Sequence, residues 1–490
     1  MQKCITRTLL ASVLLLGLAM LAVGPVAATA QVSSAGAVFV GTNHNNTCLT
    51  RTDPSCPNNL CPCPTVSEDE PANQVIMYRR DSDGLLSLIG RFDTGGQGSG
   101  PSIRFAGDGL GAAHSVELSQ DHQWLFVTNA GSNNVSVFRV SATGLERTDL
   151  VPSGGIFPNS VTQHGDLVYV LNSAGEGNIT GFRLSTAGKL TPIPGSTRPI
   201  NGNQDLVRPD TLFNPTQVSF TPDGLQLVVT IKDGPVAGLL PEFLPEFLPQ
   251  TDPPIFITPT GPGRVLVFGI GNDGRPTDLF VRTDLDNLGP FGFSFDRQGR
   301  LLIALFLGGS PVPPSGSPTG AVASYQIQED GSLTGITVAA LDFQLDTCWF
   351  ENNGRYGYSA NYTSGTVSSF GIGADGALRL LDRKAGITDE LPGGTVPGQN
   401  RQGSTPLDIR VVDQFVYDVL PGSGKVAAWR INDDGSLDKI GEFPITIQAG
   451  NVPRLLKTIN GDVAMCEVSS GVLKPCEFGP GGSPAGIAGF

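Results

Sequence analysis

The chain has 490 residues, of which 39% are hydrophobic, so it is long enough and apolar enough to bury a sizeable core. Its formal net charge of −14 excludes nucleic acid as an expected partner, because an acidic surface repels phosphate backbones. With 64 glycines and 38 prolines, the composition favours many short strands joined by turns and not helices.

Residues 1–30 have the order of features of a secretory signal peptide. A basic start and an apolar run from Leu9 to Val23 lead to the small-residue cleavage pattern Ala28-Thr29-Ala30. An uncleaved membrane anchor is the alternative, but a glycine interrupts the run and the cleavage pattern follows it. We therefore expect export, to the periplasm or the outside of the cell, of a chain that spans residues 31–490 as one domain and has no membrane span after cleavage.

The cysteine distribution indicates an oxidising compartment. Two groups lie close enough in sequence to pair, namely Cys48, Cys56, Cys61 and Cys63 near the start and Cys466 and Cys476 near the end. The second pair flanks a short turn, as a cross-hairpin disulfide would. Zinc is the alternative for the first group, but its spacing lacks the paired C-x2-C knuckles of a structural site. Cys348 is left as the odd cysteine.

Seven copies of one hairpin unit run through the chain. Each copy is a short strand with an aromatic residue at a fixed place, a turn that ends in glycine, and a second strand. The turn glycines are Gly84, Gly144, Gly188, Gly274, Gly331, Gly376 and Gly435. From the second copy onward, another pair of strands precedes each hairpin. The sequence therefore predicts an all-β, seven-bladed β-propeller with four antiparallel strands per blade.

The first copy lacks its full upstream pair of strands. Only Ala37 to Asn43 precedes its hairpin, whereas the apolar residues Pro484 to Phe490 follow a Gly/Pro-rich loop at the other end of the chain. We expect the C-terminal segment to supply the missing innermost strand and to close the ring, which removes exposed sheet edges.

The long connections are expected to share one face of the ring, since they join equivalent strands in each copy. The main insertions are about 43–72, 232–262, 385–405 and 450–483. Long loops at one end of a rigid ring are the usual place for binding or catalysis, although surface decoration is the alternative for any single loop.

Polar residues at the strand ends of that face form the candidate site at the channel mouth. The expected ligand-binding residues are Asn129, Asn159, Asn172, Lys232, Asn361 and Asp408. Asparagine also fits strand ends for local reasons, so a structural role is the alternative for each. His114 begins an inner strand and is the expected catalytic acid or base, with a hydrogen-bonded structural histidine as the alternative. No spacing indicates a metal site, and no cofactor is expected.

The repeats resemble the lactonase-type seven-bladed propellers, a family that includes bacterial 6-phosphogluconolactonase and carboxymuconate-cyclising enzymes. The segments that carry the resemblance are His114-SVELSQDHQWLFVTNAGSNNVSVF, Asn172-SAGEGNITGF, Ser219-FTPDGLQLVV and Pro484-AGIAGF. The resemblance implies an active site at the channel mouth, where a histidine that starts an inner strand works with arginines and a glutamate on a carboxylate-bearing lactone. His114 matches that histidine.

The other implied site residues are replaced. Asn159 stands where the family has an arginine after proline, Ser173 where an acidic residue is expected, and Asn361-Tyr362 where another arginine is expected. Arginine binds carboxylate or phosphate in a bidentate manner, so its loss removes the basis for that substrate class. The sequence predicts an exported, monomeric, lactonase-like propeller, either a lactone hydrolase or cyclase for another substrate or a non-catalytic propeller that binds a small molecule, glycan or protein partner.

Overall fold

The computed structural model describes most of the propeller, and the statements below concern the part of the chain that it describes. That part comprises residues 35–45, 72–100, 108–206, 209–211, 213–232, 262–285, 289–306, 320–344, 346–362, 364–388, 404–445, 465–468, 472–475 and 484–490. The expected signal peptide, the first cysteine group and Cys476 lie outside these residues. None of the described residues forms a helix with the length and apolar character needed to cross a membrane.

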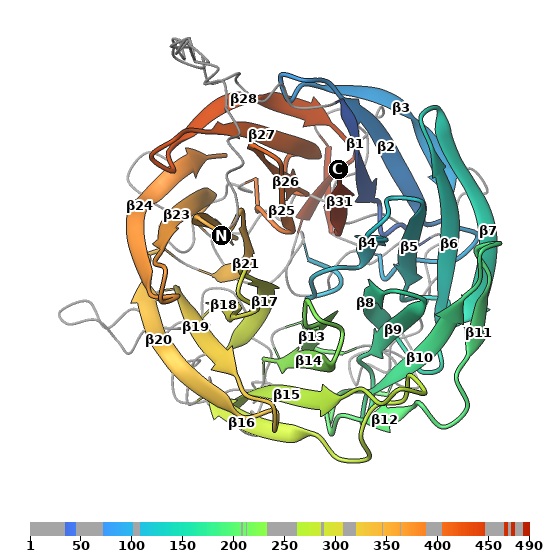
Figure 1. Ribbon diagram of the computed structural model, residues 1–490. Helices are drawn as coiled ribbons and strands as arrows, with labels where there is room; N and C mark the ends of the chain where they lie inside the picture. The colour runs from blue at the N-terminus through green and yellow to red at the C-terminus, as the bar shows by residue number, and fades with distance from the viewer. Residues whose placement is uncertain are drawn as a thin grey trace, which may run out of the picture.

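Seven antiparallel sheets surround a common axis, as Figure 1 shows, and this confirms the predicted seven-bladed propeller. We number the blades 1 to 7 in chain order and label their strands A to D outward from the axis. The A strands are β31 (Ile487–Gly489), β4 (Val116–Leu118), β8 (Pro158–His164), β13 (Pro215–Phe220), β17 (Pro290–Phe295), β21 (Thr347–Asn352) and β25 (Ile409–Val412). The B strands are β1 (Gly36–Gly41), β5 (Trp124–Asn129), β9 (Leu167–Asn172), β14 (Gln226–Ile231), β18 (Leu301–Leu305), β22 (Tyr356–Asn361) and β26 (Phe415–Leu420).

The outer half of each blade is the hairpin recognised in the sequence. The C strands are β2 (Gln74–Arg80), β6 (Asn134–Ser141), β10 (Asn178–Leu184), β15 (Gly263–Gly269), β19 (Ala321–Ile327), β23 (Thr366–Ile372) and β27 (Lys425–Ile431). The D strands are β3 (Leu86–Asp93), β7 (Gly144–Pro152), β11 (Leu190–Pro192) with β12 (Arg198–Pro199), β16 (Val281–Leu285), β20 (Leu333–Leu341), β24 (Leu378–Ile387) and β28 (Leu437–Pro444). In blade 3, β12 pairs with β10 and makes a fifth strand.

A further hairpin stands apart from the blades. Its strands are β29 (Met465–Val468) and β30 (Val472–Pro475), in which Cys466 is paired opposite Lys474. The predicted partner of Cys466 is not among the described residues, so the predicted disulfide is not tested.

The strand directions give the ring two distinct ends. Because the four strands of a blade alternate in direction, all D-to-A and B-to-C connections begin and end at one end, which we call the loop rim. All A-to-B and C-to-D turns lie at the other end, which we call the turn rim. The turn glycines suit these tight reversals: Gly435 has a φ of +87°, and a Cβ atom there would lie 2.6 Å from the ring of Tyr356.

Blade 1 is built from both ends of the propeller sequence. β31 pairs antiparallel with β1, so that its sheet has the order β3-β2-β1-β31. The Ala37 N–H donates to Phe490 O over 3.1 Å, and the Phe490 N–H donates back to Ala37 O over 3.0 Å. The structure thereby confirms the predicted closure of the ring by residues 484–490.

The core lies between neighbouring blades. The interface of blades 7 and 1, for example, buries Val419 and Val426 against Val40 and Ile76. Alternate residues of each B and C strand point to opposite neighbours, so every blade contributes to two interfaces. This packing holds the A strands rigidly around the axis, where their side chains can form a site.

Candidate functional site

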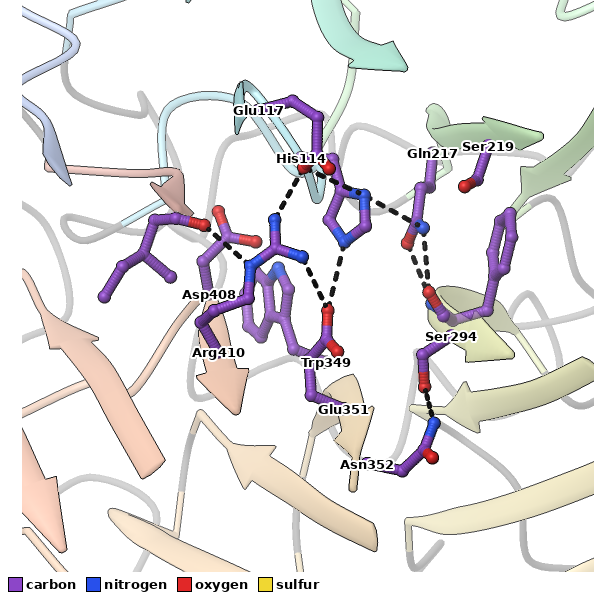
Figure 2. Close-up of polar contacts among 12 residues, drawn as sticks. His114, Glu117, Gln217, Ser219, Ser294, Trp349, Glu351, Asn352, Asp408 and Arg410 are labelled. Atoms are coloured by element: carbon purple, nitrogen blue, oxygen red, sulfur yellow. Dashed lines mark hydrogen bonds and ion pairs between the residues drawn. The ribbon is translucent and has the colours of Figure 1, made fainter. Parts of the chain in front are cut away.

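Four side chains from three blades meet at the centre of the ring and form what we call the axial cluster, which consists of His114, Glu117, Glu351 and Arg410 (Figure 2). Arg410 bridges the two carboxylates, with Nη2 2.6 Å from Glu117 Oε2 and Nη1 3.2 Å from Glu351 Oε1. The His114 ring lies between the same groups, with Nε2 3.3 Å from Glu351 and Nδ1 3.6 Å from Glu117. The four side chains are 12–20% exposed, so the cluster retains contact with solvent.

The side chain of Gln217 indicates which nitrogen of His114 carries the proton. Gln217 Oε1 accepts a hydrogen bond from the Phe293 N–H, and its Nε2 donates to Phe293 O, both over 2.8 Å, which fixes the orientation of the amide. The same amide nitrogen lies 3.4 Å from His114 Nδ1, which therefore acts as an acceptor. In that tautomer the imidazole directs its Nε2–H at Glu351.

The backbone of His114 adopts an uncommon conformation. Its φ is +59°, in the left-handed region that few non-glycine residues occupy. Two hydrogen bonds to neighbouring blades hold this conformation: the Val161 N–H donates to His114 O over 2.9 Å, and the Ala113 N–H donates to Thr216 O over 3.0 Å. Strain of this kind persists where the surroundings fix a side chain in a particular direction.

Charge balance keeps Arg410 ionised although it lies within the ring. Burial opposes the charge, but the facing carboxylates of Glu117 and Glu351 outweigh burial and hold the pKa of the guanidinium above its ordinary value. Its Nε also donates to Ile487 O of β31 over 3.2 Å. Arg410 thus joins the cluster to the strand that closes the ring.

Asp408, one of the predicted ligand-binding residues, lies beside Arg410 (Figure 2). The residue is only 3% exposed, and its carboxylate accepts a hydrogen bond from the Gly486 N–H over 2.6 Å. Burial raises the pKa of Asp408 to about 7, although the charge of His114, the hydrogen bond from Gly486 and the charge of Arg410 act in the opposite direction. The structure therefore places this group next to the cluster, with its charge sensitive to pH.

An apolar plug fills the centre of the loop rim, where the sequence suggested a polar channel mouth. One cluster of buried hydrophobic residues takes a member from the start of every blade, and these are Ala485, Ala113, Phe157, Phe213, Phe291, Trp349 and Leu407. The segment 110–113 crosses the ring, because Asn214 of blade 4 donates to Leu110 O over 2.9 Å and Trp349 of blade 6 donates to Ala112 O over 3.1 Å. Among the described residues, the axial cluster therefore lies beneath an apolar cover at this end.

The predicted asparagines belong to the walls of the ring. Asn129, Asn172 and Asn361 end three B strands, Asn159 lies in β8, and all four are fully buried. Each amide donates hydrogen bonds within its blade or to the next blade; Asn159, for example, donates to Pro215 O over 2.8 Å. The structure does not bring these four side chains together at one point, and their hydrogen bonds connect strands and loops of the blades.

Lys232 is also buried, beside the plug. Its ammonium lies 4.0 Å from the centre of the Phe291 ring and donates to Gly111 O over 3.1 Å and to Thr211 O. Burial lowers the pKa of Lys232 to about 8, although Asp108 opposes this change. A cavity of about 50 Å³ next to it is lined in part by the free thiol of Cys348. Among the described residues, no group of histidine, cysteine and acidic side chains has the arrangement of a metal site.

Sequence reasoning found His114 but missed its three partners. Glu117, Glu351 and Arg410 each pair with the third residue of the B strand in their own blade, so they occupy equivalent places in three A strands. An alignment of the seven repeats could have found these residues, because it would have shown a charged residue at the same place in three inner strands. By contrast, Asn159 and Ser173, which replace residues implied by the family resemblance, point into wall contacts.

Comparisons with known proteins agree with this architecture. A family model described as "Lactonase, 7-bladed beta-propeller" matches residues 66–200 and 312–472. Two uncharacterized proteins of Staphylococcus aureus, from strains N315 and USA300, are each 36% identical over 89 residues, or 17% of this chain. The match spans only about a quarter, 26%, of the length of those relatives.

Solved structures resemble the chain in fold. A periplasmic gluconolactonase from Pseudomonas aeruginosa has a TM-score of 0.53 at 16% identity, with 84% of this chain and 97% of that chain covered. A proposed 6-phosphogluconolactonase from Bacteroides fragilis has a TM-score of 0.52 at 14% identity, with 85% and 96% covered. At these identities the likeness concerns the fold alone, so any chemistry has to be argued from the residues of the site.

Proposed function

The chain belongs to the lactonase family of seven-bladed β-propellers, and from that premise we propose that it is a lactone hydrolase whose reaction takes place at the axial cluster. The observation that carries the proposal is the position of His114, held by Glu351 at one ring nitrogen and facing Gln217 and Glu117 with the other. A histidine oriented by a carboxylate is a common general base for the attack of water on an ester.

In the proposed reaction, His114 Nδ1 accepts a proton from water as the water oxygen attacks the lactone carbonyl carbon. The carbon–oxygen bond of the ring then breaks, and the imidazolium returns the proton to the departing alkoxide, which leaves an open-chain hydroxy acid. Glu351 stabilises the imidazolium through the Nε2–H, 3.3 Å away. Ring closure by a cyclase would use the same groups in reverse.

Arg410 is proposed to position both carboxylates. It contacts Glu117 and Glu351 at once, so it holds Glu351 at the distance that His114 needs. Gln217 supplies a polar N–H on the other side of the imidazole. These are positioning roles, since each acts through His114.

The test is hydrolysis of a panel of γ- and δ-lactones by the purified protein, followed by proton release. We expect His114→Ala to lower kcat/KM by about 100-fold or more, the usual contribution of a general base. Glu351→Gln should lower kcat with a smaller effect on KM, because it acts on the base and not on the substrate. His164→Ala, at the end of β8, is the matched control. Unchanged hydrolysis by the His114 variant would rule out this residue.

A non-catalytic binding propeller is the second candidate. The specific observation in its favour is that Glu117 and Glu351 already match the charge of Arg410, while Asn159 and Ser173 stand in place of the residues implied by the family. Such a protein would bind a small molecule, glycan or protein partner without turnover. A folded parent protein that hydrolyses no lactone of the panel above the uncatalysed rate would favour this candidate.

Export is part of the proposed function, and it rests on the basic start, apolar run and Ala28-Thr29-Ala30 pattern of the sequence. Expression of the full chain with a C-terminal tag, followed by cell fractionation and N-terminal sequencing, tests it. The expected first residue of the exported form is Gln31. A tagged protein that stays in the cytoplasm with Met1 intact would contradict export.

A further inference from the structure

The place in each A strand that pairs with the third residue of the B strand forms what we call the axial layer. Glu117, Glu351 and Arg410 hold this place in blades 2, 6 and 7. In the other four blades the residues are uncharged, and they are Gly489, Thr162, Ser219 and Phe293. The axial layer therefore contains two carboxylates and a single guanidinium.

The charges around Arg410 are negative in sum. In the form in which His114 acts as a base, its imidazole carries no charge. The carboxylates of Glu117 and Glu351 then exceed the guanidinium of Arg410 by one negative charge. Asp408 lies beside Arg410 (Figure 2), and because burial raises its pKa to about 7, its carboxyl group adds negative charge above neutral pH. The centre of the ring therefore attracts a cation and repels an anion.

The hydrogen-bonding groups of the cluster show the same bias. Each nitrogen of Arg410 already donates to the protein, Nε to Ile487 O and the two Nη atoms to the glutamates. The glutamates use one oxygen each for these bonds, Glu351 Oε1 and Glu117 Oε2. Glu351 Oε2 and Glu117 Oε1 have no partner among the described residues, and neither is a buried atom, so both reach solvent. The cluster thus offers acceptors, while its guanidinium is occupied.

A protonated amine fits these groups. An ammonium group has three N–H donors and no acceptor, so it can bond to the open oxygens of the two glutamates. A carboxylate or phosphate needs a cation whose charge is not already matched, and the axial layer contains none. A hydroxyl group can donate to the same oxygens, but it leaves the negative charge in place.

We propose that the axial cluster binds a ligand that carries a protonated amine, and that the substrate of the proposed reaction is an amino-substituted lactone. The second statement rests on the proposed function, whereas the first does not need turnover. The ammonium group would donate to Glu117 Oε1 or Glu351 Oε2 and bring the charge of the cluster to zero. A lactone that carries a carboxylate or phosphate would be repelled.

The test compares three probes that share one ring and differ in charge. Cyclopentylamine, cyclopentanol and cyclopentanecarboxylate are titrated into the full-length protein at pH 7 and low salt, and calorimetry measures binding. We expect the amine to bind with a Kd of about 1–10 mM, as suits a ligand of few atoms, and the other two at least about tenfold more weakly.

Glu117→Gln should weaken binding of the amine by about tenfold, as loss of a charge-assisted contact does. The matched control is Glu329→Gln, which removes an exposed carboxylate from the turn between β19 and β20 and should bind as the parent does. The comparison of the three probes uses the parent alone, so it decides the matter even where Glu117→Gln does not fold.

Nuclear magnetic resonance locates the bound amine. The chain has four histidines, so ring-labelled histidine gives four signals, and the one absent from His114→Ala belongs to His114. Cyclopentylamine should shift this signal and leave that of His164 in place.

Three results would overturn the proposal: equal or tighter binding of the carboxylate or the alcohol, amine binding that Glu117→Gln leaves unchanged, or an unshifted His114 signal. The proposed reaction is tested separately with α-amino-γ-butyrolactone and γ-butyrolactone, each rate being divided by its uncatalysed rate. Amine binding at His114 without hydrolysis would sustain the inference about the ligand while the reaction fails. Hydrolysis without a preference for the amino lactone would leave the reaction standing and overturn the substrate class.

Discussion

Arg410 is the residue on which the arrangement of the axial cluster depends. It places one guanidinium between the carboxylates of Glu117 and Glu351, which would otherwise repel each other beside His114. Removing one partner from a partly buried ion-pair network leaves the charges of the others uncompensated. The resulting loss of stability is usually larger than the net stabilisation that the intact pair provides. The geometry of the histidine is therefore coupled to an arginine of another blade.

Asp408 makes stability depend on pH in a defined direction. Its folded-state pKa of about 7 lies above the ordinary value of 3.8, so the folded state holds the proton more tightly than the unfolded state does. Its contribution to the free energy of unfolding is present below about pH 4 and is lost as pH rises towards 7. Asp408→Asn keeps an acceptor for the Gly486 N–H and cannot ionise.

We therefore expect Asp408→Asn to gain stability relative to the parent as pH rises from 4 to 7, by up to about 4 kcal/mol as an upper bound. Urea unfolding at several pH values measures the free energy of unfolding of the parent and of the variant. Subtracting one from the other at each pH removes the contribution of the groups that both proteins share. A constant difference across this range would show that Asp408 does not change its protonation state on unfolding there.

Asn129, which the sequence suggested as a ligand-binding residue, makes hydrogen bonds within the wall of the ring. Its Oδ1 accepts hydrogen bonds from Asn73 (2.9 Å) and Thr94 (2.7 Å), and its Nδ2 donates to Asn134 and Ser136, both over 2.8 Å. Asn129→Ala should lower the free energy of unfolding by about 3 kcal/mol, because it leaves buried polar groups without partners.

Asn172 offers the comparison, since its Nδ2 donates to Ser153 O and Asn178 Oδ1 while its Oδ1 has no partner among the described residues. We expect Asn172→Ala to cost about 1 kcal/mol, clearly less than Asn129→Ala. Equal losses, measured by urea unfolding, would mean that the recorded bonds of Asn129 add little.

At the residue scale, the sequence predicted His114 because it starts an inner strand and matches a family residue. It did not predict Glu117, Glu351 or Arg410, because their contacts join different blades, with Arg410 lying 293 residues from Glu117 and 59 residues from Glu351. Proximity across the axis depends on ring geometry, which no local pattern contains.

Elements were predicted far better than contacts, since each strand pair carries its own signal. The alternation of apolar residues and the turn glycines identify the C and D strands locally, and Gly435 with its φ of +87° is an example. The closing strand β31 was predictable for a different reason: the first blade lacked an inner strand, and the apolar segment 484–490 was left over.

Deletion of residues 484–490 tests the role of β31. The change removes buried Ile487 and Ala488, the backbone bonds to β1, and the acceptor of Arg410 Nε. We expect the thermal midpoint to fall by about 5 °C or more, since burying one isoleucine contributes about 3 kcal/mol. Circular dichroism measures the midpoint, and an unchanged value would contradict closure by this strand.

The whole molecule joins a rigid wall to an apolar cover. The sequence suggested a polar mouth because asparagines gather at strand ends, but the centre of that rim is filled by Phe157, Phe213 and Trp349 together with Leu110. These residues lie in different blades, and each taken alone resembles ordinary core. The plug could not be predicted because it is a property of the assembled ring.

Covalent closure of the ring should be tolerated. Ala37 and Phe490 exchange two hydrogen bonds, so one inserted asparagine between Phe490 and Gly36 would make a two-residue Asn-Gly hairpin turn. A permuted chain can then begin at Gly144 and end at Thr143, an exposed turn.

We expect the permuted protein to have the same circular dichroism spectrum as the parent and an equal or higher thermal midpoint. The reason is that the two strands that close the ring are then adjacent in sequence and no longer have to be brought together from distant parts of the chain. Calorimetry measures the midpoint. A fall of more than about 5 °C would mean that the joint is strained or that the new ends disturb blade 2.

Because blade 1 combines strands from both ends of the propeller sequence, the ring can be completed only after the last strand has been synthesised. About 450 residues separate β1 from β31, so at ribosomal rates of about 5–20 residues per second the first strand waits roughly 20–90 s for its inner partner. During synthesis β1 therefore keeps an unpaired edge, and a product that terminates early keeps it permanently. Cellular proteases and chaperones that recognise such edges can distinguish finished chains from unfinished ones by the presence of a single short segment.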